Sequence, residues 1–156
     1  TPFTTTGRES RGVHMSASNV DETGEPASWG SSVPDSDFTA AESALTASIP
    51  VAWKTYLQRE QWLSKGRLRS GTFVTLLSPT DAQGLMSAWD EALEAHPGFY
   101  PLGTDGSRNL YCLDLRSPEL GVLLTDNSSG GWDEAESLNL SVEEFVAQID
   151  NGTFRP

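Results

Sequence analysis

The chain has 156 residues and a formal net charge of −12, from 22 acidic and 10 basic side chains. This length allows one domain with a substantial core. The negative charge argues against binding to nucleic acid or to anionic lipid. No apolar run approaches the roughly 18 residues that span a bilayer, so the sequence does not predict a membrane-embedded protein.

The single cysteine, Cys112, excludes an internal disulfide framework. The first ten residues lack the basic start and the apolar stretch of a secretory signal. Both observations favour a cytoplasmic location.

Residues 1–34 are rich in Thr, Ser, Gly and Pro and show neither a helical nor a strand period. This composition is typical of an irregular tail, of which Trp29 and Val33 are the predicted anchors. The run Gly-Val-His-Met at 12–15 suggests that part of the tail derives from a vector. The sequence thus predicts a tail at 1–34 and one domain at 35–156.

Two helices are predicted at the start of the domain. The first begins near Asp35, and its apolar residues recur at spacings of three and four. Pro50 is well placed to open the second helix, and Gly66 can end it in a left-handed conformation. The second helix is therefore predicted over residues 50–65, with Trp62 and Leu63 extending its buried side.

Runs of apolar and β-branched residues indicate strands in the rest of the domain. A third helix is predicted from Thr80 to His96, and a last one begins at Ser141, where Glu144 completes a capping box. Short links, including the Asp105-Gly106 turn, favour antiparallel pairing. The predicted strands are 72–77, 99–102, 110–115 and 121–126.

This order of elements predicts the α+β class, with a mostly antiparallel central sheet and about four helices packed on it. Charge is distributed unevenly, because residues 46–80 are net positive and residues 117–156 hold eight acids against one base. Arg67 and Arg69 alternate with Leu68 as on an exposed edge strand, where cations discourage unwanted sheet pairing. The negative field is thus expected on one side of the domain.

Few side chains suit catalysis. His14 lies in the predicted tail, and His96 closes a helix, where the helix dipole favours a protonated imidazole. Cys112 sits between apolar neighbours and is predicted to be a buried structural thiol. Neither a zinc-binding pattern nor a phosphate-binding glycine loop is present, so neither a metal nor a cofactor is predicted. The sequence therefore favours a binding protein over an enzyme.

Carboxylates gather near the C-terminal strands, at Asp126, Asp133, Glu134 and Glu136. Their spacing does not match the calcium-binding loop pattern, so a solvated acidic loop is the favoured interpretation. Two carboxylates that meet in space can also hydrolyse glycosides, which leaves a carboxylate hydrolase as an open alternative.

The ordered landmarks of the chain resemble the SUKH superfamily, which includes bacterial immunity proteins and fungal cell-wall assembly regulators. The resemblance covers residues 36–154, nearly all of the predicted domain. Each motif has low specificity, and the resemblance depends on their order and spacing. The matching pieces are Phe38–Leu45, Ile49-Pro50 with Trp53, Tyr56 and Leu57, Leu76–Pro79, Pro97–Arg108, Gly121–Asp126 and Ser141–Phe145.

The resemblance implies a scaffold that binds another protein, in bacteria commonly a toxin such as a nuclease. The acidity of the chain suits a basic partner. We therefore expect an immunity-type protein that neutralises a cognate toxin, and the alternative is a regulatory interaction module with no toxin partner. The residues expected at the partner surface are Asp126, Trp132, Asp133, Glu134 and Glu136, with Asp105 either joining them or serving its own turn.

Overall fold

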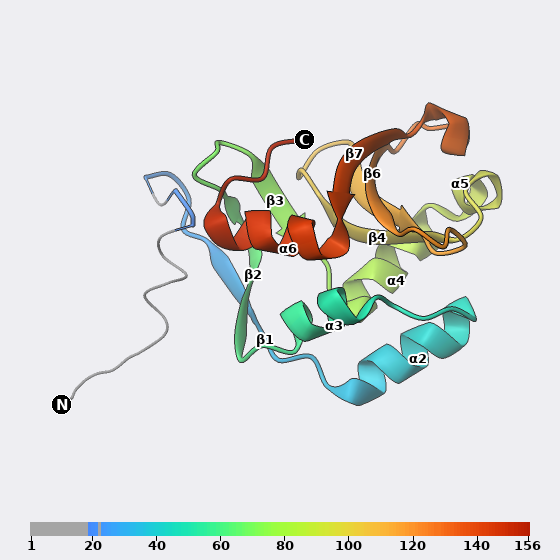
Figure 1. Cartoon of the computed structure of the whole chain (residues 1–156), viewed down its shortest axis with the longest axis horizontal. Helices are drawn as coiled ribbons and strands as arrows, with labels where there is room; N and C mark the ends of the chain where they lie inside the picture. Colours follow the sequence, from blue (N-terminus) through green and yellow to red (C-terminus); the bar gives the residue numbers. More distant parts are fainter. Residues whose placement is uncertain (1–18, 22) are drawn as a thin grey trace.

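The computed structural model describes residues 19–21 and 23–156 and contains a seven-stranded sheet (Figure 1). The strands are hydrogen-bonded in chain order, and every neighbouring pair is antiparallel. The predicted α+β class and the antiparallel sheet are confirmed. His14 and the predicted leader at 12–15 lie outside the described residues. The strands are β1 (Ser28–Ser31), β2 (Gln61–Arg67), β3 (Phe73–Leu76), β4 (Phe99–Thr104), β5 (Asn109–Asp114), β6 (Gly121–Asp126) and β7 (Glu136–Ser141).

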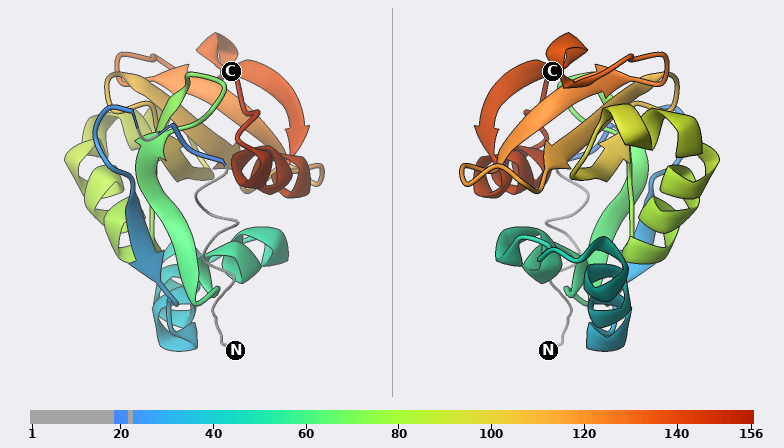
Figure 2. Two further views of the ribbon diagram at one scale, coloured as in Figure 1. Left: turned by 90° about the vertical axis from the view of Figure 1, so that its left-hand side faces the viewer. Right: turned by 90° about the vertical axis from the view of Figure 1, so that its right-hand side faces the viewer.

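Helices lie on both faces of the sheet, with α6 on one side and α4 with α5 on the other (Figure 2). Helix α3 packs against α6, and α2 packs against α4. In the described part of the chain, no helix is long and apolar enough to cross a membrane. The described helices, one more than the sequence predicts, are α2 (Asp35–Leu45), α3 (Val51–Leu57), α4 (Pro79–Ala88), α5 (Asp90–Ala95) and α6 (Val142–Asn151), together with the 3₁₀ helix η1 (Trp132–Glu134).

Aromatic side chains fill the core between the sheet and α6. Trp53 stacks on Tyr56 with the ring centroids 5.1 Å apart, and Phe145 of α6 packs against Trp53 and against Tyr111 of β5. Helix α6 begins with the capping box predicted at Ser141, whose side chain accepts the backbone N–H of Glu144. The amphipathic pattern of α6 therefore places its apolar side on the sheet.

The predicted second helix ends at Leu57, because residues 61–67 form strand β2 instead of continuing it. Strand β2 pairs with β1 on one side and with β3 on the other. The Trp62 indole N–H donates to the Ser31 carbonyl at 2.8 Å, which ties the two strands together. Arg67 consequently lies on an interior strand, and its assignment to an exposed edge is wrong.

The sheet begins before residue 35, in the segment for which the sequence predicts an irregular tail. Residues 28–31 form the edge strand β1, and Val20 forms a bridge with Leu68. Val33 is 6% exposed and Trp29 packs on the core, so both predicted anchors are confirmed. The residues that pair here lie far apart in the sequence, which is why local composition did not predict the pairing.

The predicted third helix is interrupted at Trp89, which separates α4 from α5. Trp89 adopts φ −106° and ψ 28°, outside the helical region. Its ring packs on His96 and Phe99, and its indole N–H donates to the Asn127 carbonyl at 3.1 Å. These contacts fix Trp89 against the β6–β7 connection.

The mid-helix acid Glu42 joins α2 to the start of α3. Its carboxylate accepts the backbone N–H of Ile49 at 2.7 Å and the Lys54 ammonium at 3.0 Å. The hydrogen bond from Ile49, followed by that from Lys54, holds the pKa of Glu42 below its ordinary value. Glu42 therefore stabilises the fold as a carboxylate.

Replacing Glu42 with Gln is expected to lower the free energy of unfolding at pH 7 by about 1 kcal/mol. Because the folded-state pKa of Glu42 is lowered, its contribution is complete above the ordinary value of 4.5 and is lost as the pH falls through the folded value. The difference between Glu42→Gln and the natural chain should shrink over that range. Urea unfolding between pH 7 and 3 measures it, with Glu60→Gln as the control; a difference that does not vary with pH contradicts the assignment.

Candidate functional site

Five of the six residues expected at the partner surface lie in the connection from β6 to β7. Asp126 is the last residue of β6, and Glu136 is the first residue of β7. Between them, η1 carries Trp132, Asp133 and Glu134. The structure therefore brings these five residues together at one end of the sheet.

The sixth residue, Asp105, is held in the β4–β5 turn. Its carboxylate accepts the backbone N–H groups of Ser107 and Asn109, at 2.9 and 3.2 Å. The Asn109 side-chain amide donates to the same carboxylate at 2.8 Å. Asn109 is also the partner of Asp126 across β5 and β6, so the turn adjoins the end of β6. Asp105 thus serves the turn, as one of the two expectations has it.

A cluster of four rings joins Trp132 of η1 to the two ends of α5 and to the start of β4, and we call Trp89, His96, Phe99 and Trp132 the aromatic support. The centroids of Trp132 and His96 lie 5.2 Å apart, and those of Trp89 and Phe99 lie 4.7 Å apart. The Trp132 indole N–H donates to the Pro97 carbonyl at 2.8 Å. Trp132 is consequently half-buried, with η1 fixed against the end of α5.

His96 is the buried centre of the aromatic support, with only 1% of its surface exposed. Its Nδ1 lies 2.7 Å from the Ala92 carbonyl, which requires a proton on Nδ1, and its Nε2 lies 2.8 Å from the Ser129 hydroxyl. The Ser129 hydroxyl also lies 3.0 Å from the Gly131 carbonyl. His96 therefore ties the loop before η1 to α5, a role beyond the helix closure that the sequence predicts.

Helix α5 adds two acids that the sequence did not connect with the others, Asp90 and Glu94. Both are exposed, as are Asp133, Glu134 and Glu136. A run of acids in a short helix is visible in the sequence, but its position beside η1 depends on the fold (Figure 1). We call the six carboxylates the acidic face: Asp90, Glu94, Asp126, Asp133, Glu134 and Glu136.

The carboxylates of the acidic face are not engaged in direct ion pairs with described cations. Between described residues, none of its six carboxylates forms an ion pair. The Ser128 hydroxyl and backbone N–H donate to Asp126 and hold the pKa of that carboxyl below its ordinary value, to which Arg108 adds. The Glu134 carboxylate accepts the Gly130 N–H at 2.9 Å. The face is thus available for a basic partner.

Groups suited to catalysis are scarce in the described residues. Cys112 is fully buried, and burial raises the pKa of its thiol. No cluster of three His, Cys, Asp or Glu side chains within residues 19–21 and 23–156 is placed to hold a metal ion. The acidic face thus consists of exposed and half-exposed carboxylates beside a packed cluster of aromatic rings.

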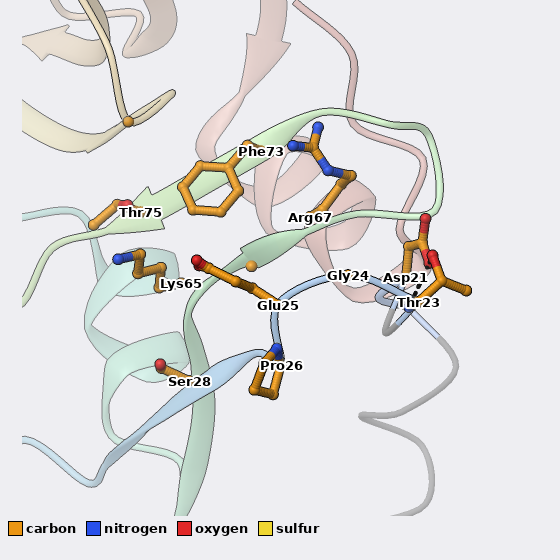
Figure 3. A pocket seen from close by; sticks show the side chains of 12 residues that line it. Asp21, Thr23, Gly24, Glu25, Pro26, Ser28, Lys65, Arg67, Phe73 and Thr75 are labelled. Carbon is orange, nitrogen blue, oxygen red and sulfur yellow. Dashed lines mark hydrogen bonds between the residues drawn. The ribbon is translucent and has the colours of Figure 1, made fainter.

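A separate pocket of about 680 Å³ lies beside strands β1 to β3, where residues 23–26 pass over β2 and β3 (Figure 3). Residues 19–21 pair with 67–69, and residues 28–31 pair with 61–65. Residues 23–26, which lie between these two pairings, form one wall of the pocket. Sequence reasoning missed this pocket because it treated the segment as tail.

A scan of the chain against protein-family models gave no match, and a search against curated proteins gave none either.

Proposed function

We propose that this chain is an immunity-type protein that binds and neutralises a basic protein toxin, such as a nuclease, through the acidic face. The observation that carries the proposal is a group of six carboxylates without a direct ion pair among the described residues, five of them exposed, on η1, on the neighbouring α5 and at the adjoining strand ends. The order of SUKH-like motifs supports the same class of function. A cytoplasmic location suits the proposal, because the only cysteine is a free thiol.

Electrostatics and rigidity both favour protein binding at this face. Carboxylates of one sign on one side of a protein raise the association rate of a basic partner. Aromatic side chains near the centre of a charged rim frequently dominate binding energy, and Trp132, which directly precedes Asp133 and Glu134 in η1, is our candidate for that role. The aromatic support also fixes η1 before binding, which reduces the entropy lost on association.

Neutralisation in cells tests the proposal directly. Proteins captured from the source organism on the immobilised chain are identified, and their genes are expressed with and without this chain. We expect at least one captured protein to be basic and lethal alone, and co-expression to restore growth. Restoration should weaken when Asp133, Glu134 and Glu136 are all replaced by their amides. Captured partners that are harmless alone would contradict the toxin assignment and favour a regulatory module.

A further inference from the structure

The pocket beside β1 presents two opposite charges that have no partner among the described residues. Lys65 and Glu25 both line it, yet they do not form an ion pair with each other or with another described side chain. The chain has only one other lysine, Lys54, and that lysine is paired with Glu42 at 3.0 Å. An unpaired ammonium and an unpaired carboxylate therefore line one opening (Figure 3).

Hydroxyl groups surround the Lys65 ammonium because of the strand register. Lys65 is paired with Ser28 of β1 and with Thr75 of β3, so the three side chains form a row on one face of the sheet. Both hydroxyls line the pocket, and neither has a hydrogen-bond partner among the described residues. An ammonium flanked by two hydroxyls is a set of donors suited to a carboxylate.

Among the described residues that line the pocket, the other two charged side chains are already engaged. The Asp21 carboxylate accepts the backbone N–H and the hydroxyl of Thr23, at 2.9 and 2.6 Å. The Arg67 guanidinium donates to the Gly71 carbonyl at 2.9 Å and lies 5.8 Å from the centroid of the Phe73 ring. Lys65 and Glu25 are therefore the described charged side chains that remain for a ligand. Phe73, at the start of β3, adds an apolar surface to the pocket.

From this geometry we propose that the pocket binds a small zwitterion of the amino-acid type. Its carboxylate lies at Lys65, Ser28 and Thr75, its ammonium lies at Glu25, and its apolar side chain lies over Phe73. A simple anion would face the unpaired carboxylate of Glu25, and a simple cation would face Lys65. A ligand that carries both charges pairs with Lys65 and with Glu25 at once. The volume of about 680 Å³ is within the range of small-molecule sites.

Titration of the full-length chain with L-phenylalanine, followed by NMR of backbone amides, tests this proposal. We expect saturable shifts at Gly66, Thr75 and Gly106, which line the pocket. Phenylpropionate lacks the ammonium and phenylethylamine lacks the carboxylate, so each is expected to bind about tenfold more weakly or worse. Equal affinity for phenylpropionate would overturn the zwitterion, as would the absence of saturable shifts.

Matched variants locate the binding. Lys65→Gln and Glu25→Gln should each weaken L-phenylalanine binding about tenfold, since each removes one charged hydrogen-bonding partner. Lys54→Gln removes the same charge from α3, outside the pocket, and should leave the affinity unchanged. The spectrum of each variant shows whether it is folded. A loss with Lys54→Gln equal to that with Lys65→Gln would sink the proposal. The proposed amino-acid site does not depend on the acidic face, so the outcome of these titrations does not affect the proposal of toxin binding.

Discussion

Replacing Asp133, Glu134 and Glu136 together with Asn, Gln and Gln is expected to weaken binding of the basic partner by roughly threefold to 150-fold. Each exposed charge pair contributes about 0.2–1 kcal/mol, and three of them act together here. The Gln at position 134 retains an oxygen that can accept the Gly130 N–H, so the loop before η1 should keep its conformation. Most of the loss should appear in the association rate, because the charges lie at an exposed rim.

The dependence of binding on ionic strength shows whether the triple variant binds more weakly because it has lost charge or because its surface has changed shape. Affinity of the natural chain should fall as ionic strength rises, and the triple variant should show a shallower fall. The matched control replaces Glu60, Glu119 and Glu143 with Gln, since these exposed acids lie outside the acidic face and the net charge changes equally. Association kinetics over a salt series provide the measurement. If the control weakens binding as much as the triple variant, bulk charge explains the effect and the acidic face does not.

His96→Ala is expected to lower the free energy of unfolding by about 2–4 kcal/mol. The substitution leaves a cavity between Trp89, Phe99 and Trp132, and it removes the partners of the Ala92 carbonyl and the Ser129 hydroxyl. The loop before η1 also loses its tie to α5, so partner affinity should fall even though His96 is buried. Urea unfolding and partner binding by the same variant measure both effects.

A second substitution at His96 distinguishes the stability lost with the side-chain volume from the stability lost with the two hydrogen bonds. His96→Phe fills most of the cavity but makes neither bond, so its stability should lie between those of His96→Ala and the natural chain. A stability loss below about 0.5 kcal/mol for His96→Ala would mean that the aromatic support does not hold the connection, since that is the range of ordinary surface substitutions.

Strand β7 shows what a closer inspection of the sequence can find. Leu138 and Leu140 alternate with Ser137 and Asn139, which is the period of a half-buried strand. The strands predicted above do not include this segment. The paired β1 had no comparable signal, since only four residues take part and their partners lie thirty or more positions away.

The local features of this protein follow from the sequence by itself. The capping box of α6 and the turn at Asp105 depend on side chains that bond to backbone groups within a few residues. The left-handed Gly152 after α6 depends on the lack of a Cβ atom. Such bonds form in the same way whatever the distant chain does, so their residue patterns predict them. The apolar periods likewise predicted α6 and most of the sheet.

The tertiary structure alone decided which of these pieces meet. The basic stretch around β2 does not form a helix end, because pairing with β1 and β3 overrides its local preference. The acidic face exists because the aromatic support places α5 beside η1, although about forty residues separate them. The pocket at Lys65 exists because residues 19–21 and 28–31 both pair with the chain at β2, whereas residues 23–26 between them line the pocket. Contacts between distant segments depend on the packing of the whole sheet, and no window of sequence contains them.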